Sequence, residues 1–206
     1  MISNDTKDQY ITLASYERGV QRFVDKTPPV IADDSTLGKW IQFFLSQLQK
    51  DDEILEIGTG TGKDADYMES RGYHVTRSDA VDAFIEMNKQ RWKNILKLDI
   101  LDFDFTRMVQ GVFANMVLLH FTKLQFRTIV QHIASILPVW AIFAFSMKKG
   151  EWSEIEETSI GEPRFFQYWH EDDLETELKE LWFTSLYNVI SEDDGRMFIN
   201  MVAKKV

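Results

Sequence analysis

Hydrophobic positions recur at helical spacing in the first fifty residues of the chain. Across residues 10–24 the apolar side chains fall three and four positions apart, which predicts an amphipathic helix that ends before Pro28. A second helix is predicted over 37–48, where one apolar stripe is continuous and Ser35 is placed to cap the amino end. The chain therefore begins with two predicted helices.

From residue 53 onward, short apolar strands alternate with amphipathic helices. The pattern predicts strands at 53–57, 73–77, 95–98, 111–119 and 140–147, and helices at 63–70, 81–91 and 124–137. A polar connection over 148–161 and a short helix at 172–181 follow. Two further strands, 183–190 and 196–203, flank Asp194-Gly195, which is a strong hairpin signal. This order predicts an α/β sandwich with a mostly parallel sheet and one antiparallel pair.

Composition narrows the function classes. The 206 residues contain no internal repeat and no Pro- or Ser-rich linker, so we expect a single domain over 1–206. A net charge of −10 disfavours generic nucleic-acid binding. The chain has no cysteine, which excludes disulfides and thiolate metal sites. Neither a signal peptide nor a membrane span is predicted, and we expect a cytoplasmic location.

A glycine-rich segment joins the strand at 53–57 to the next helix. It reads Glu56-Ile57-Gly58-Thr59-Gly60-Thr61-Gly62, and its glycines permit positive φ and close approach of a ligand to the backbone. The dinucleotide fingerprint G-x-G-x-x-G has its third glycine one place later, and the segment also lacks the P-loop pattern. The carboxylate of Glu56 suits a ligand with an ammonium group better than a pyrophosphate. A plain tight turn without a ligand is the alternative.

Two further acids end predicted strands. Asp79 can accept hydrogen bonds from the two hydroxyls of a ribose, and Asp99 can accept from an exocyclic amine such as adenine N6. Either could instead be a solvated turn residue. Because ligands of open α/β sheets bind at the carboxyl ends of the strands, we expect both acids beside the glycine segment.

At these positions the chain resembles the class I S-adenosylmethionine-dependent methyltransferases, in particular small bacterial enzymes of the tellurite-resistance and ubiquinone-biosynthesis type. The resemblance rests on residues 54–64, 75–79, 98–100 and 117–120, within a core of 51–147. It implies a Rossmann-like three-layer sandwich with a seven-stranded sheet and an antiparallel C-terminal hairpin. It also implies S-adenosyl-L-methionine as cofactor, with residues 1–34 as a helical extension that serves as a lid.

The resemblance assigns expected roles to particular side chains. The methionine part would lie against the glycine segment, the ribose at Asp79 and the adenosine pocket at Ala80 and Asp99-Ile100. Independently of the resemblance, Tyr16 lies off the apolar stripe of the first helix and could cap the cofactor as part of a lid, with a solvated tyrosine as the alternative. The expected cofactor-binding residues are Tyr16, Glu56, Gly58, Thr59, Gly60, Gly62, Asp79, Ala80, Asp99 and Ile100.

Catalytic residues are less constrained, because methyl transfer is an in-line displacement that chiefly needs alignment. His120, at the end of the predicted fourth strand, is the first candidate for a general base, and His170, after an aromatic run, is the second. Each could equally be structural. No metal-ligand cluster is predicted.

A small-molecule O or N acceptor is expected for the methyl group. The acceptor, the acceptor atom and the oligomeric state are not determined by these motifs. A non-catalytic S-adenosylmethionine-binding regulatory or assembly protein is the main alternative. A transferase that uses another adenosyl ligand is a third hypothesis.

Overall fold

Two helices precede the sheet in the computed structural model, which describes residues 4–102, 105–157 and 160–206. They are α1 (Asn4–Lys26) and α2 (Thr36–Ser46). The predicted cap is present, since the Ser35 hydroxyl accepts from the Gly38 amide at 3.0 Å. Helix α1 is longer than the 10–24 stretch predicted from periodicity, and residues 1–3 of the expected extension lie outside the described residues.

Strands and helices then alternate along the chain. The strands are β1 (Glu53–Ile57), β2 (His74–Asp79), β3 (Ile95–Lys97), β4 (Gly111–Ala114), β5 (Ile142–Lys149), β6 (Ser153–Glu157), β7 (Pro163–Trp169), β8 (Phe183–Asp193) and β9 (Arg196–Lys205). The remaining helices are α3 (Lys63–Glu69), α4 (Asp82–Gln90), α5 (Lys123–Ile136) and α6 (Glu171–Glu180), with 3-10 turns η1 (Ile100–Asp102) and η2 (Leu118–His120).

The sheet contains the predicted topology but has nine strands and not seven, because β7 pairs with β5 and β6 pairs with β7. Strands β3, β2, β1, β4 and β5 lie side by side and parallel, and β9 continues the sheet antiparallel to β5 with β8 beside it. Asp194 and Gly195 both have positive φ, as a two-residue hairpin turn between β8 and β9 requires. The predicted α/β fold, with a mostly parallel sheet and an antiparallel C-terminal hairpin, is confirmed.

Two predictions of local structure were wrong. The connection after β5 contains the antiparallel pair β6–β7, which was not predicted because residues 148–161 are mostly polar. The aromatic side chains of β7 lie in the protein interior, where Phe165, Phe166 and Trp169 are buried. The fourth strand ends at Ala114 and does not run to Leu119, because Met116 has a φ of 59° and turns the chain out of the sheet into η2.

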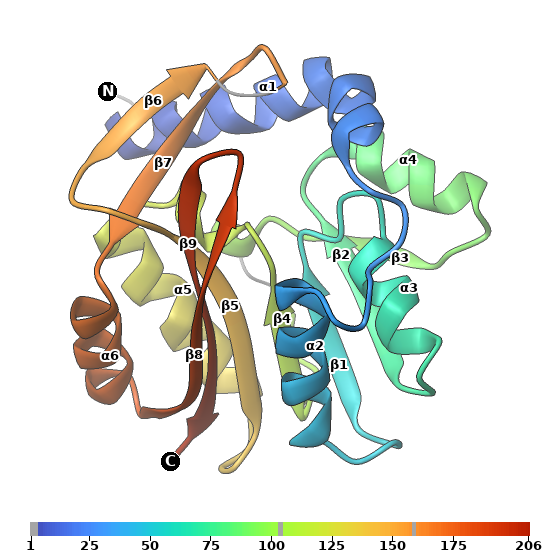
Figure 1. The fold of residues 1–206 in the computed structure, drawn as a ribbon, viewed down its shortest axis with the longest axis vertical. Helices are drawn as coiled ribbons and strands as arrows, with labels where there is room; N and C mark the ends of the chain where they lie inside the picture. The colour runs from blue at the N-terminus through green and yellow to red at the C-terminus, as the bar shows by residue number, and fades with distance from the viewer. Residues whose placement is uncertain (1–3, 103–104, 158–159) are drawn as a thin grey trace.

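Helices cover both faces of the sheet, which gives three layers (Figure 1). On one face Trp40 and Phe44 of α2 pack on Phe113 of β4, with ring centroids 4.8 and 5.5 Å apart. On the other face Phe126 of α5 packs on Phe145 of β5. Alternate strand residues supply the two cores, as expected for a sheet buried on both sides.

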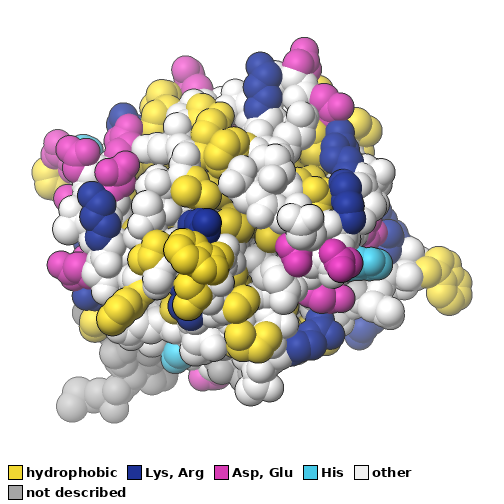
Figure 2. Space-filling view, turned by 90° about the horizontal axis from the view of Figure 1, so that it is seen from below, with side chains coloured by type: hydrophobic (Ala, Val, Ile, Leu, Met, Phe, Trp, Pro, Cys, Tyr) yellow, Lys and Arg dark blue, Asp and Glu magenta, His cyan; other side chains and the backbone are white. Residues whose placement is uncertain are grey.

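The two ends of the sheet differ in character. Figure 2 shows the lower end, where apolar side chains gather among charged ones. Trp140 and Trp182, which lie beside the end of β9, are 64% and 70% exposed there. The upper end is covered by α1 (Figure 1). Within the described part of the chain, no helix is long and apolar enough to cross a membrane.

Arg77 of β2 fixes the segment that follows β1. Its guanidinium is 1% exposed, donates to the Gly62 carbonyl at 3.0 Å, and pairs with Asp66 and Glu69 of α3 at 2.7 and 2.9 Å. We expect Arg77→Met to lower the free energy of unfolding by about 1–3 kcal/mol, because the buried carbonyl loses its donor.

The matched control is Lys89→Met, which removes the exposed Lys89–Glu86 pair of α4. This change should cost less than about 0.5 kcal/mol. Urea denaturation of both variants measures the difference. Equal losses would show that Arg77 contributes no more than a surface ion pair.

Candidate active site

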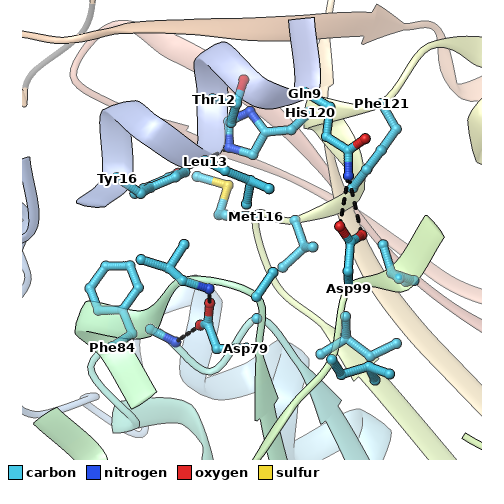
Figure 3. Close-up of a pocket in the computed structure, with 18 of the residues that line it drawn as sticks. Gln9, Thr12, Leu13, Tyr16, Asp79, Phe84, Asp99, Met116, His120 and Phe121 are labelled. Carbon is cyan, nitrogen blue, oxygen red and sulfur yellow. Dashed lines mark hydrogen bonds between the residues drawn. The ribbon is translucent and has the colours of Figure 1, made fainter. Parts of the chain in front are cut away.

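A cavity lies at the carboxyl ends of the parallel strands, beneath α1 (Figure 3). Its floor comes from the glycine segment, the end of β2 and the residues that follow β3 and β4. Its roof is one face of α1, formed by Gln9, Thr12, Leu13 and Tyr16. These four positions have i, i+3, i+4, i+7 spacing, so a single helical face covers the cavity.

The glycine segment is close-packed. Gly58 and Gly62 have φ of 69° and 82°. A Cβ on Gly58 would lie 2.4 Å from Val117, and a Cβ on Gly62 would lie 2.5 Å from the Asn88 side-chain oxygen. Gly58 and Gly60 line the cavity, whereas Gly62 faces the side chains beneath it. The backbone at 58–60 is therefore open to a ligand.

Glu56 lies under the segment and not on the cavity wall. Its side chain is buried and accepts a hydrogen bond from the Thr59 hydroxyl. Burial, together with the nearby Asp64 carboxylate, raises the pKa of Glu56 to about 8. Glu56 is therefore largely protonated at neutral pH, and neither Glu56 nor Thr59 is brought to the cavity with the other predicted residues.

Asp79 faces the cavity from the end of β2 (Figure 3). Its two oxygens accept from the amides of Gly60 and Val81, each at 2.9 Å. Burial raises the pKa of Asp79 to about 6. The carboxylate is held rigidly beside Ala80, which also lines the cavity, and its remaining lone pairs can accept from ligand hydroxyls.

Asp99 lines the cavity just after β3, the strand beside β2, and is already in contact with α1. The Gln9 amide nitrogen donates to both of its carboxylate oxygens, at 3.1 and 3.0 Å (Figure 3). Ile100 lies beside it on the wall. A primary amide offers the same N–H donors as an exocyclic amine, so Gln9 occupies the acceptor positions predicted for adenine. Gln9 was not predicted, although the spacing of Gln9, Leu13 and Tyr16 on one helical face could have indicated it.

His120 and Tyr16 meet on the opposite wall. Tyr16 Oη lies 3.0 Å from His120 Nε2, and His120 Nδ1 lies 2.7 Å from the Phe165 carbonyl oxygen. Arg164 of β7 donates to Tyr16 Oη at 2.6 Å. Burial, and then the positive charge of Arg164, lowers the pKa of His120 to about 3, so the imidazole is neutral at physiological pH.

His170 lies apart from this group. It is exposed at the amino end of α6 and does not line the cavity. Asn115 and Met116, which follow β4, were not singled out from the sequence but line the cavity. Asn115 is fixed by Asp64 at 2.8 Å and by the Ser146 hydroxyl at 3.0 Å.

The donor set suits an adenosyl ligand. Two carboxylates line the cavity from the ends of the neighbouring strands β2 and β3, and the backbone at 58–60 lies on the β1 side of Asp79. Most of the remaining wall is apolar, as is usual for small-molecule sites. Among the described residues, no three His, Cys, Asp or Glu side chains are grouped so that they could hold a metal ion.

Solved structures of methyltransferases share this fold. A Burkholderia thailandensis 1,6-didemethyltoxoflavin N1-methyltransferase, solved with S-adenosylhomocysteine, is 17% identical at a TM-score of 0.78, covering 100% of this chain and 92% of its own. The DhpI complex with S-adenosylhomocysteine is 16% identical in sequence, with a TM-score of 0.75, and the match covers 99% of this chain and 98% of DhpI. Magnesium protoporphyrin IX methyltransferase from Synechocystis, with S-adenosylmethionine bound, is 12% identical in sequence, with a TM-score of 0.66. The match covers 100% of this chain and 86% of that enzyme.

Sequence comparison identifies the family. No curated protein matches the chain. The family model of a methyltransferase domain matches residues 31–186, which is most of the chain and includes the glycine segment, both cavity carboxylates and His120. The chain therefore belongs to the methyltransferase domain family and is, as predicted, a class I S-adenosylmethionine-dependent methyltransferase.

Proposed function

We propose that the protein transfers the methyl group of S-adenosyl-L-methionine to an oxygen or nitrogen atom of a small molecule. The observation that carries the proposal is the cavity beneath α1, in which Asp79 and Asp99 face one region and Tyr16 and His120 face another. Helix α1 covers part of the cavity, which favours a small acceptor over a polymer. Two methyltransferases of similar structure are named for small molecules, 1,6-didemethyltoxoflavin and magnesium protoporphyrin IX.

In the proposed complex the two carboxylates orient the cofactor. Asp79 accepts from the ribose hydroxyls, and Asp99 accepts from the adenine amine once Gln9 moves aside. Gly58 and Gly60 contact the methionine part through their backbone. The bound cofactor supplies an electrophilic methyl group on a sulfonium. The apolar wall around Met116 and Phe121 excludes water from that group.

His120 is the proposed general base when the acceptor is a hydroxyl. It lines the cavity, and the contact of its Nδ1 with the Phe165 carbonyl leaves Nε2 as the proton-accepting nitrogen. A soft or already deprotonated acceptor would need only alignment. His170, which is exposed, has no part in this proposal.

Release of S-adenosylhomocysteine across a library of small hydroxyl, amine and ring-nitrogen compounds tests the proposed function. We expect turnover with at least one compound, with the added methyl located on oxygen or nitrogen by mass spectrometry. The Asp79→Ala variant serves as the background control. Tight cofactor binding without turnover on any compound would favour the non-catalytic binding protein instead.

Gly58→Ala tests the close packing of the glycine segment. The added Cβ would clash with Val117 and force a positive φ on alanine. Cofactor affinity should fall at least about tenfold, since displacement of the loop misplaces its backbone. Gly72→Ala is the matched control: φ is 83° there, but no atom lies within 4 Å of the new Cβ. It should cost about 1 kcal/mol of stability and leave affinity unchanged, as calorimetric titration and urea denaturation would show.

Asp79→Ala tests the ribose contact against Asp82→Ala. Asp79 should account for a 10- to 100-fold difference in cofactor affinity, since hydrogen bonds to a charged group contribute about 1.5–3 kcal/mol. Asp82 is exposed in the first turn of α4 and pairs with Lys97 at 2.6 Å, so its loss should change affinity less than about twofold. Equal losses by calorimetric titration would contradict the assignment of Asp79.

The pH dependence of binding gives the same assignment a second check. Ribose hydroxyls donate to the ionised carboxylate, so affinity is fully present above the pKa of Asp79, which is about 6 in the free protein. As the pH falls below about 6, affinity should drop up to about tenfold per unit. Asp79→Ala should lose this dependence. A wild-type affinity at pH 5 equal to that at pH 7 would exclude the contact.

A further inference from the structure

The hydrogen bonds around His120 fix the position of its proton. The Phe165 carbonyl oxygen can only accept, so His120 Nδ1, 2.7 Å away, carries the hydrogen. The neutral ring then presents a lone pair on Nε2. Tyr16 Oη, 3.0 Å from Nε2, is therefore the donor in that contact. The lone pair of the proposed base is directed at a tyrosine hydroxyl and not at open space.

Arg164 completes a directed chain. A guanidinium has no acceptor, so Arg164 donates to Tyr16 Oη at 2.6 Å, and the tyrosine proton is left for His120. The phenol oxygen keeps one acceptor position, and the Tyr16 side chain lines the cavity. Its ring is held edge-on by Phe23 and tilted against Phe84, with centroids 5.7 and 6.0 Å away.

We propose that Tyr16 is a catalytic residue that receives the proton of a hydroxyl acceptor and passes its own proton to His120. The inference rests on the proposed function and extends it to the acceptor side of the cavity. The acceptor oxygen forms its bond to the methyl carbon as the carbon–sulfur bond of the cofactor breaks. The acceptor proton moves to Tyr16 Oη, and the Tyr16 proton moves to His120 Nε2.

The cations near His120 oppose its protonation, and loss of the sulfonium charge in the same step offsets that cost. His120 is surrounded by Tyr16 of α1, Arg164 of β7 and Lys148 of β5, and the two cations disfavour a second positive charge on the ring. Methyl transfer removes the positive charge of the sulfonium as the imidazolium forms. The net charge of the site is therefore unchanged through the step, and the His120 imidazole stays neutral until the sulfonium charge is lost.

The position of Tyr16 on α1 adds a constraint. His120 and Arg164 come from the body of the protein, and only α1 brings the phenol between them. Contacts of Ser15 with the Pro163 carbonyl and of Thr12 with the Phe165 amide fix α1 against β7, at 2.5 and 3.0 Å. The relay is complete only while α1 covers the cavity.

The first arm of the test needs no cofactor. In histidine-labelled protein, nitrogen NMR should show His120 protonated on Nδ1 and unprotonated on Nε2, with its signals assigned by their loss in His120→Asn. Tyr16→Phe should shift the Nε2 resonance. Tyr10→Phe, which alters an exposed tyrosine of the same helix, should not. A proton on Nε2 in the wild type would overturn the proposal.

The second arm uses a hydroxyl acceptor identified by release of S-adenosylhomocysteine. Tyr16→Phe and His120→Asn should each lower kcat about 10²–10⁴-fold. The kcat of the double variant should be no lower than that of the less active single variant. Cofactor affinity, measured by calorimetry, should stay within about threefold of wild type. Tyr10→Phe should leave kcat unchanged.

The outcomes separate the two proposals. The absence of wild-type turnover would overturn the proposed function and the relay with it. Wild-type turnover retained in Tyr16→Phe, or additive losses in the double variant, would overturn the relay alone. Rates measured in mixtures of H2O and D2O give the number of protons that move in the rate-limiting step. More than one such proton in the wild type, and one in Tyr16→Phe, would support the relay.

Discussion

The docking of α1 across the carboxyl ends of the strands is the interaction on which the site depends. Without it Asp79, Asp99 and His120 would line an open cleft at the edge of a sheet. With it they face a partly covered cavity of low polarity, where each hydrogen bond and charge contributes more than in water. The docking is polar through Gln9 and Ser15 and, farther along the helix, aromatic through Tyr16 and Phe23.

Enclosure also explains the protonation states in the site. Burial raises the pKa of Asp79 and lowers the pKa of His120, so both groups are biased toward their neutral forms. Backbone amides keep Asp79 ready to ionise, whereas Arg164 keeps His120 neutral. One wall therefore suits binding through a carboxylate, and the other suits a neutral base. The fold separates these two tasks between the end of β2 and the turn η2.

Much of the cofactor side was predictable from the sequence because its determinants are local. Alternating apolar strands and helices indicate a parallel sheet, and the carboxyl ends of parallel strands meet at one edge. The predicted strand end at Asp79 therefore placed this acid beside Gly60, and the structure joins them by a hydrogen bond of 2.9 Å. The hairpin turn at Asp194-Gly195 was predictable for the same reason, since two residues determine its backbone.

The acceptor side was decided by tertiary structure. Tyr16, His120 and Arg164 lie far apart in sequence and meet only because α1 and the unpredicted strand β7 pack against η2. Hydrophobic periodicity does not predict such a contact. The consecutive aromatic residues of β7 also lack the alternating pattern by which a strand is recognised. The strand and helix pattern thus predicted the fold, and the family resemblance carried by the glycine spacing and the strand-end acids implied the cofactor. Long-range packing alone decided which polar groups share the cavity, since hydrogen bonds between distant elements leave no local pattern.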